Sequence, residues 1–339
     1  MQKINADRIY LGVVVAAVVA LSLGCFVFKD DPSPEPADDQ CNGVDTIPTL
    51  IDEDFTADDD CGVIDELIVV DGARLSVQPG TTLEFRSGAG IHVRDDGSLY
   101  ARGDDDEPVE FRGVTGERGS WMGILFDQTT NRDNIIESAT VAGGGEAAWD
   151  GRPEVGPANV TVVDGRAELV DVDLRDSGGY GLDISGDSRL TIGGDNQWSE
   201  NHLEPVRTTP ALVDQLTSET SYRNNDIDAI YVTEGTISED ARWARFDVPI
   251  RIAGIIVVEA NLTIASGNEL IFEEGAGVDV SDNGNMEVDG DDEDIRLRGT
   301  DSVEPAGDVE EVLMDRDLRL RSVCVRGGES TVDVNDNCP

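Results

Sequence analysis

The stretch Leu75-Ser-Val-Gln-Pro-Gly-Thr-Thr-Leu-Glu-Phe-Arg-Ser-Gly-Ala-Gly-Ile-His-Val-Arg-Asp-Asp-Gly-Ser-Leu99 recurs without a gap as Leu262-Thr-Ile-Ala-Ser-Gly-Asn-Glu-Leu-Ile-Phe-Glu-Glu-Gly-Ala-Gly-Val-Asp-Val-Ser-Asp-Asn-Gly-Asn-Met286. In both copies, short runs of alternating apolar and polar residues are separated by Gly, Asn and Asp. Alternation of this kind predicts β-strands, and the small residues between the runs predict turns.

The similarity extends beyond these stretches, so that residues 66–145 return as residues 254–329. We therefore expect two homologous halves. No helical periodicity is found after residue 30, which predicts an all-β protein. A sandwich would need longer strands and a core with more aromatic residues than the 5% of this chain. Short strands with a turn after each suit a coil whose successive turns stack on one another.

The chain resembles the right-handed parallel β-helix proteins of the pectin-lyase-like class, in the form found in secreted and cell-surface proteins. Besides the first copy, the resemblance rests on Gly97-Ser-Leu-Tyr-Ala-Arg-Gly103, Ser120-Trp-Met-Gly-Ile-Leu-Phe126 and Asn134-Ile-Ile-Glu-Ser-Ala-Thr-Val-Ala-Gly-Gly144. It implies an all-β, right-handed parallel β-helix over residues 61–339. Because this fold hosts many unrelated functions, the resemblance implies no particular activity.

The N-terminus holds an uncharged, mostly apolar stretch over residues 9–28. Residues 1–29 have two interpretations that remain open. Leu21-Ser-Leu-Gly-Cys25 resembles a lipobox, which makes Cys25 a candidate for lipidation after cleavage of a signal peptide. About twenty apolar residues also suit an uncleaved signal-anchor helix. Both place the rest of the chain outside the cytoplasm on a membrane tether, with residues 30–60 as an acidic, Pro- and Asp-rich linker and N-terminal cap.

The chain of 339 residues carries 71 Asp and Glu against 25 Lys and Arg, a formal net charge of −46. This charge excludes a nucleic-acid-binding protein, because phosphate recognition needs a basic surface. Lysine occurs only at positions 3 and 29. A lysine-poor acidic surface keeps a protein hydrated in concentrated salt, so we expect a saline environment. A calcium-loaded surface and a GC-rich genome are the alternatives.

Five cysteines occur, of which Cys25 lies in the apolar N-terminal stretch. Outside the cytoplasm, the other four predict the disulfides Cys41–Cys61 and Cys324–Cys338, at the two ends of the coil. Free buried thiols are the alternative. Zinc is disfavoured because the sequence has no Cys-x-x-Cys motif.

No group of catalytic residues is evident. Enzymes on the resembled fold cluster Asp with Lys, Arg or His, whereas His92 and His202 lie in dissimilar contexts. His92 alternates with Ile91 and Val93 and aligns with Asp279 in the second copy, which indicates an outward, solvated position. We therefore predict no catalytic residues, although so many carboxylates leave a polysaccharide lyase or hydrolase open as an alternative.

Four acidic clusters are candidates for Ca²⁺, the one cofactor that the sequence suggests: Asp58-Asp-Asp60, Asp104-Asp-Asp106, Asp289-Gly-Asp-Asp-Glu-Asp294 and Asp333-Val-Asn-Asp-Asn-Cys-Pro339. Carboxylate oxygens in turns suit this ion. None of the four has the central glycine and closing glutamate of a helix–loop–helix calcium loop, so plain solvated turns explain them equally well.

Two of the four tryptophans, Trp121 and Trp243, lie in alternating apolar runs and are predicted to be in the core. Trp149 and Trp198 lie in polar, Gly- or Asn-rich segments, where they are candidate ligand-binding residues that stack on sugars, or local packing anchors. Residues 197–228 form the largest irregular insertion between the copies, where we expect specificity to reside.

Taken together, these features predict a non-catalytic, membrane-tethered, cell-surface structural or interaction protein. Its expected partner is a surface polysaccharide or another surface protein. A carbohydrate-binding adhesin is the first alternative and a polysaccharide lyase or hydrolase the second.

Overall fold

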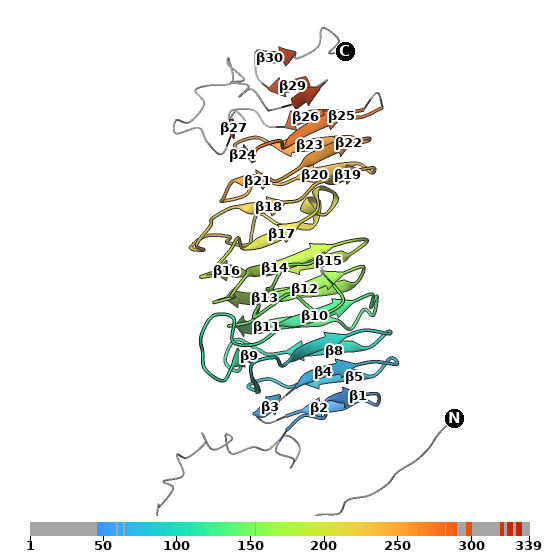
Figure 1. The fold of residues 1–339 in the computed structure, drawn as a ribbon, viewed down its shortest axis with the longest axis vertical. Coiled ribbons are helices and arrows are strands. Elements are labelled where there is room, and N and C mark those ends of the chain that lie inside the picture. Colours follow the sequence, from blue (N-terminus) through green and yellow to red (C-terminus); the bar gives the residue numbers. More distant parts are fainter. Residues whose placement is uncertain are drawn as a thin grey trace, which may run out of the picture. The chain divides into compact units, whose positions relative to one another are not determined.

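The computed structural model describes residues 46–289, without residues 59, 64, 153 and 282, together with strands at 296–299, 319–321, 324–327 and 330–333. The chain divides into two units, residues 1–35 and 36–339, and the described residues belong to the second. In this unit the strands stack turn upon turn along a coil (Figure 1).

The coil has three sides of eight residues. Five consecutive strands begin eight residues apart: β4 (Glu66–Val69), β5 (Arg74–Val77), β6 (Thr82–Phe85), β7 (Gly90–Val93) and β8 (Ser98–Arg102). Each strand pairs in parallel with the third strand after it, so that Leu67 lies opposite Ile91, 24 residues later. Gly72, Gly80 and Gly88 turn three successive corners with φ of 76° to 79°, a conformation that favours glycine.

One side of the coil is a parallel sheet of eleven strands, termed here the long sheet. Its order is β1 (Leu50–Ile51), β4, β7, β10 (Ile124–Asp127), β12 (Ala158–Val163), β14 (Tyr180–Ser185), β17 (Val206–Thr208), β18 (Ile230–Val232), β21 (Ile250–Ile252), β24 (Glu269–Phe272) and β27 (Arg296–Gly299).

The second side of the coil is the one that contains β5, and the third side is the one that contains β6. These two sides share one ten-stranded sheet in the first half of the coil. It contains β2 (Phe55–Ala57), β5, β8, β3 (Cys61–Val63), β6, β9 (Val109–Gly113), β11 (Ile135–Ala142), β13 (Arg166–Arg175), β15 (Arg189–Gly193) and β16 (Gln197–Ser199). Strands β11 and β13 bend from the second side onto the third at Ser138 (φ 47°) and Asp171 (φ 54°). These bends join the two sides into one sheet.

Farther along, the second and third sides form separate sheets. One contains β19 (Gly235–Ile237), β22 (Ile255–Val258), β25 (Gly277–Val280) and β28 (Arg319–Arg321), and the other β20 (Ala241–Trp243), β23 (Asn261–Ala265) and β26 (Asn285–Asp289). A 3₁₀ helix, η1 (Pro210–Gln215), lies between β15 and β19, and β29 (Cys324–Gly327) and β30 (Ser330–Asp333) form an antiparallel hairpin.

The interior of the coil is one continuous apolar core, to which every second strand residue contributes. Trp121, Trp198 and Trp243 are all buried in it. On the third side, the rings of Trp198, Tyr222 and Phe246 stack one turn apart in edge-to-face contacts of 5.4 and 5.8 Å. This aromatic column fills the coil where η1 and irregular backbone replace strands.

The predicted all-β parallel coil is confirmed. The aligned copies do not occupy equivalent sides, however, because β7 belongs to the long sheet whereas β25, which aligns with it, does not. The sequence similarity between the copies therefore reflects the eight-residue repeat that all three sides share, and it does not show on which side a strand lies. The duplication into two homologous halves and the right hand of the coil stay predictions.

Residues 197–228, which we expected to be the largest irregular insertion, hold η1 and only the short strands β16 and β17, and they keep the regular 24-residue period of the coil. Val206 lies opposite Ile230, 24 residues later. Their many polar residues are used inside the stack: the buried amide of Asn201 donates to Asn225 one turn later at 2.9 Å. A longer excursion lies between Ile124 and its partner Val160, which are 36 residues apart, twelve more than 24.

Residues 1–45 lie outside the described part of the chain, and with them the predicted anchor, Cys25 and Cys41. Cys338 is also outside it, and of Cys61 and Cys324 only the backbone is described, in β3 and β29. Within the described ranges, no helix is long and apolar enough to span a bilayer. Strands β1 and β2 fall within residues 30–60, the range predicted as linker and cap.

Candidate functional site

The outer face of the long sheet carries a row of side chains from residues that lie opposite one another in neighbouring strands and so point the same way. The row consists of Ile68, His92, Leu125, Thr161, Asp183, Arg207, Tyr231, Arg251 and Ile271. Its charged and aromatic members set this face apart from the apolar interior of the coil.

Residues 143–157, which connect β11 to β12, cover the first half of this row and are termed here the strap. Leu125, Thr161 and Asp183 point out of the coil, yet they are only 0–1% exposed. In the strap, Trp149 and Val155 pack with Leu125 in an apolar cluster separate from the inner core. The strap therefore shields the outer face of three successive turns from solvent.

A histidine and an arginine share one carboxylate beneath the strap. Nε2 of His92 lies 3.2 Å from Oδ2 of Asp127, and its Nδ1 lies 2.8 Å from Oε1 of Glu66. Arg152 of the strap donates from Nη2 to Oδ1 and from Nε to Oδ2 of Asp127. The ring of Trp149 lies 5.7 Å from that of His92. Asp127 thus holds the strap through a two-point contact with a guanidinium group.

Asp183 is the second anchor of the strap. It accepts a hydrogen bond of 2.6 Å from the backbone N–H of Gly156, and Nη1 of Arg207 donates to both of its oxygens. Arg207 also donates to the carbonyl of Glu154 at 3.0 Å. Burial raises the pKa of Asp183 to about 6 in spite of these partners.

Beyond the strap, the outer face opens into what is termed here the tyrosine–arginine patch, formed by Tyr180, Arg207, Tyr231 and Arg251. The rings of Tyr180 and Tyr231 lie 6.2 Å apart, and the guanidinium of Arg251 lies 5.5 Å from the centre of the Tyr231 ring.

Two carboxylates hold Arg251 in place within this patch. It donates to the buried Glu204 and pairs with Glu273, each at 2.6 Å. Burial raises the pKa of Glu204 above its ordinary value. The patch therefore presents half-buried aromatic and guanidinium groups in fixed positions.

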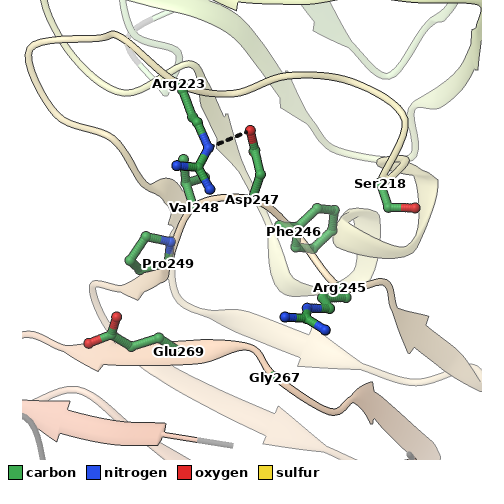
Figure 2. A pocket seen from close by; sticks show the side chains of 9 residues that line it. All are labelled: Ser218, Arg223, Arg245, Phe246, Asp247, Val248, Pro249, Gly267 and Glu269. Atoms are coloured by element: carbon green, nitrogen blue, oxygen red, sulfur yellow. Dashed lines mark hydrogen bonds and ion pairs between the residues drawn. The ribbon is translucent and has the colours of Figure 1, made fainter. Parts of the chain in front are cut away.

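A separate hollow of about 430 Å³ lies where the turns before β18, β21 and β24 meet (Figure 2). Arg223 and Asp247 form an ion pair at 3.0 Å on one wall, Arg245 lies on another, and Glu269 lies across from them. The charges are mixed and the hollow is open, so its lining does not select one class of ligand.

The two tryptophans predicted as ligand-binding residues lie elsewhere than expected. Trp198 is 0% exposed, in β16 and in the inner core, because its strand alternation points it inward. Trp149 is 5% exposed beneath the strap backbone. Neither indole presents an exposed face, and their burial fits the alternative that both are packing anchors. Trp121 and Trp243 are in the core as predicted.

His92 points outward as predicted, but it is paired with carboxylates rather than solvated. His202 is largely exposed and lies 3.0 Å from Asp226. Oδ1 of Asp104 accepts hydrogen bonds from the backbone N–H groups of Asp106 and Glu107, which is a capped turn. In the described residues, no three His, Cys, Asp or Glu side chains converge as metal ligands. The clusters at 289–294 and 333–339 fall largely outside that part.

Sequence reasoning missed Asp127, Asp183, Arg207 and Arg251, which hold the strap and the patch. One signal was available: Asp183, Arg207 and Tyr231 are spaced by 24 residues, the period of the coil. The period was visible only after the pairing of strands was known. No family model, curated protein or solved structure matches this chain. The geometry of the outer face therefore carries the functional interpretation.

Proposed function

We propose that this protein is a non-catalytic interaction scaffold that binds its partner on the outer face of the long sheet. The observation that carries the proposal is the state of the buried carboxylates on that face. Asp127, Asp183 and Glu204 each engage an arginine, and Asp183 also accepts from a backbone N–H group. These groups are arranged to hold other parts of the protein.

Polysaccharide cleavage would require something different from these carboxylates. A general acid or base must reach the substrate within hydrogen-bond distance and exchange its proton there. Asp183 has a raised pKa suited to an acid, but it is fully buried and both of its oxygens already accept from Arg207. An enzyme therefore ranks behind a binding protein, and an assay for new polysaccharide chain ends tests it.

The setting of the scaffold follows from sequence features. The apolar stretch over residues 9–28 supports a membrane tether, by lipid on Cys25 or by a signal-anchor helix, with the coil outside the cytoplasm. The net charge of −46 supports a saline environment. The cysteine pairs Cys41–Cys61 and Cys324–Cys338 are proposed to close the ends of the coil.

Carbohydrate binding is the second candidate, and the tyrosine–arginine patch favours it. Tyrosine rings bind the apolar faces of sugars, and guanidinium groups bind their hydroxyls and carboxylates. Tyr231 and Arg251 are adjacent in the row, and Tyr180 lies beside them. The proposed carbohydrate-binding surface therefore consists of two tyrosines instead of the two buried tryptophans.

The test is retention of the full chain by a panel of neutral and uronic-acid polysaccharides at high salt, with and without Ca²⁺. We expect Tyr231→Ala and Arg251→Gln to reduce retention at least about tenfold. Arg112→Gln is the matched control, because Arg112 also pairs with two glutamates but lies on the third side of the coil. Equal retention of all variants would show that the patch does not bind polysaccharide. If no polysaccharide retains the protein, the proposed partner is another protein.

A further inference from the structure

The strap is an addition to the coil rather than part of it. It accounts for the twelve residues by which the interval from Ile124 to Val160 exceeds the regular turn. Three consecutive glycines, at 143–145, begin it, and Gly143 and Gly145 both have φ of 74°. Gly156 lies next to its end, where a Cβ atom would lie 2.5 Å from the ring of Tyr180. Glycine at these positions allows the close approach of the strap backbone to the coil, because a side chain there would meet neighbouring atoms.

The strap contacts the long sheet as a bound peptide contacts a receptor. It places an aromatic ring, Trp149, against His92 and Leu125, and three residues later it places the guanidinium of Arg152 on Asp127. Near its end, the backbone N–H of Gly156 donates to Asp183. These contacts extend over three strands of the long sheet, β7, β10 and β14.

The strap leaves polar atoms at the surface beneath it without hydrogen bonds. The hydroxyl of Thr161 points into this surface between Leu125 and Asp183, is fully buried, and has no hydrogen-bond partner among the described residues. Nε1 of Trp149 is also buried without a partner in that part of the chain. Buried polar atoms without partners are uncommon, because each costs about 1–3 kcal/mol. The strap therefore fits this surface less well than another ligand with suitably placed polar groups would.

We propose that the strip formed by His92, Leu125, Asp127, Thr161 and Asp183 is a binding site for an arginine-containing peptide segment of a partner protein, and that the strap is its intramolecular occupant. The matching segment carries an aromatic residue three positions before its arginine. It displaces Trp149 and Arg152, and a polar group of its own pairs with Thr161. This inference rests on the proposed interaction function and names the chemistry of one partner.

Charge and tethering determine when the exchange occurs. The site centres on two carboxylates in a chain of net charge −46, so a cationic segment is attracted to it. The strap competes as a tethered ligand at an effective concentration in the millimolar range. A partner segment must therefore bind more tightly than the strap, or be tethered itself through contacts elsewhere on the coil.

The experiment uses the full chain and a fluorescein-labelled peptide with the sequence of residues 145–157, followed by fluorescence anisotropy. The variant Trp149→Ala/Arg152→Gln loosens the strap, and we expect it to bind the peptide at least about tenfold more tightly than the unaltered chain. Adding Asp127→Asn should abolish this binding. A peptide with glutamine in place of its arginine should not bind.

A second measurement covers the case in which the double variant is poorly folded by circular dichroism. For this measurement the peptide is unlabelled and carries phenylalanine in place of its tryptophan, so that all tryptophan fluorescence comes from the protein. In the unaltered chain, displacement of the strap by this peptide should expose Trp149 and raise quenching of its fluorescence by acrylamide, because the other three tryptophans are in the core. Three results would each overturn the proposal. These are a folded variant that binds no peptide, equal binding of the glutamine peptide, and unchanged quenching at saturating peptide. Polysaccharide retention is measured on the unaltered chain without peptide, so that a negative peptide result beside intact retention counts against this site and not against the proposed function.

Discussion

Asp183 on β14 and Arg207 on β17 lie opposite each other on the outer face of the long sheet, and one guanidinium nitrogen, Nη1, donates to both carboxylate oxygens at 3.1 and 2.8 Å. The pair lies at the boundary between the strap, which it holds through Gly156 and Glu154, and the tyrosine–arginine patch. A single ion pair therefore joins the two parts of the candidate interaction face.

The first prediction concerns the pH dependence of stability. Burial raises the pKa of Asp183 to about 6, above the value of about 3.9 in an unfolded chain. The folded state therefore holds this proton more tightly, and the resulting stabilisation is present below pH 4 and is lost as pH rises through 6. We expect the stability of the unaltered chain relative to Asp183→Asn to fall by about 2–3 kcal/mol between pH 4 and pH 7.

Urea unfolding at fixed salt and several pH values measures this difference. The exposed Asp105→Asn serves as the control and should show no such change. A difference between the unaltered chain and Asp183→Asn that stays constant, or grows with pH, would show that Asp183 is not held in the buried state described here.

The second prediction separates the two tryptophans that the sequence had grouped together. Trp198→Ala removes a ring from the aromatic column in the inner core and should lower the free energy of unfolding by about 3–5 kcal/mol. Trp149→Ala empties only the outer cluster under the strap and should cost about half as much. Urea midpoints of the two variants at equal salt measure both losses of stability. A larger loss in Trp149→Ala than in Trp198→Ala would contradict the positions assigned to the two rings.

The third prediction concerns the buried amides that connect turns. Asn201 accepts from the backbone N–H of Ser177 at 3.0 Å and donates to the carbonyl of Leu174 at 3.1 Å and to Asn225. Asn201→Ala leaves these groups buried without partners and should destabilise the coil by about 2–4 kcal/mol. Asn261→Ala, at an exposed position, is the control for thermal unfolding. Equal melting temperatures for the two variants would refute this role.

The fourth prediction concerns salt. At a net charge of −46 the folded chain repels itself, and raising salt from 0.1 M to 1 M shortens the screening length from about 10 Å to about 3 Å. The melting temperature measured by calorimetry should therefore rise over this range, to the same extent in NaCl and KCl. A melting temperature that falls or stays constant would contradict adaptation of this surface to a saline environment.

The sequence was sufficient to predict the strands and the coil because their signals are local. Alternation in Leu75-Ser-Val77 and Leu83-Glu-Phe85 gives each strand and its inward residues, which the structure buries. The same local pattern occurs on all three sides of the coil. Sequence alignment therefore could not reveal that β7 and β25 lie on different sides.

The candidate site depended on pairing that no local pattern reveals. His92 could be placed on the outer face from its neighbours, but its contact with Asp127 depends on an interval of 33 residues between His92 and Leu125, which differs from the regular 24. Trp198 was misplaced because its neighbours are polar, although these residues form hydrogen bonds within the stack. Sequence composition alone could not distinguish a polar loop from a polar turn of the coil.

The most direct test of the central claim is an assay for new chain ends when the full chain is incubated with neutral and uronic-acid polysaccharides at high salt. If Asp127, Asp183 and Glu204 serve to hold the interaction face, reducing ends and unsaturated products should stay at the level of the polymer alone, with or without Ca²⁺. Release of products by the unaltered chain, and its loss in Asp183→Asn, would contradict the account and make the protein an enzyme.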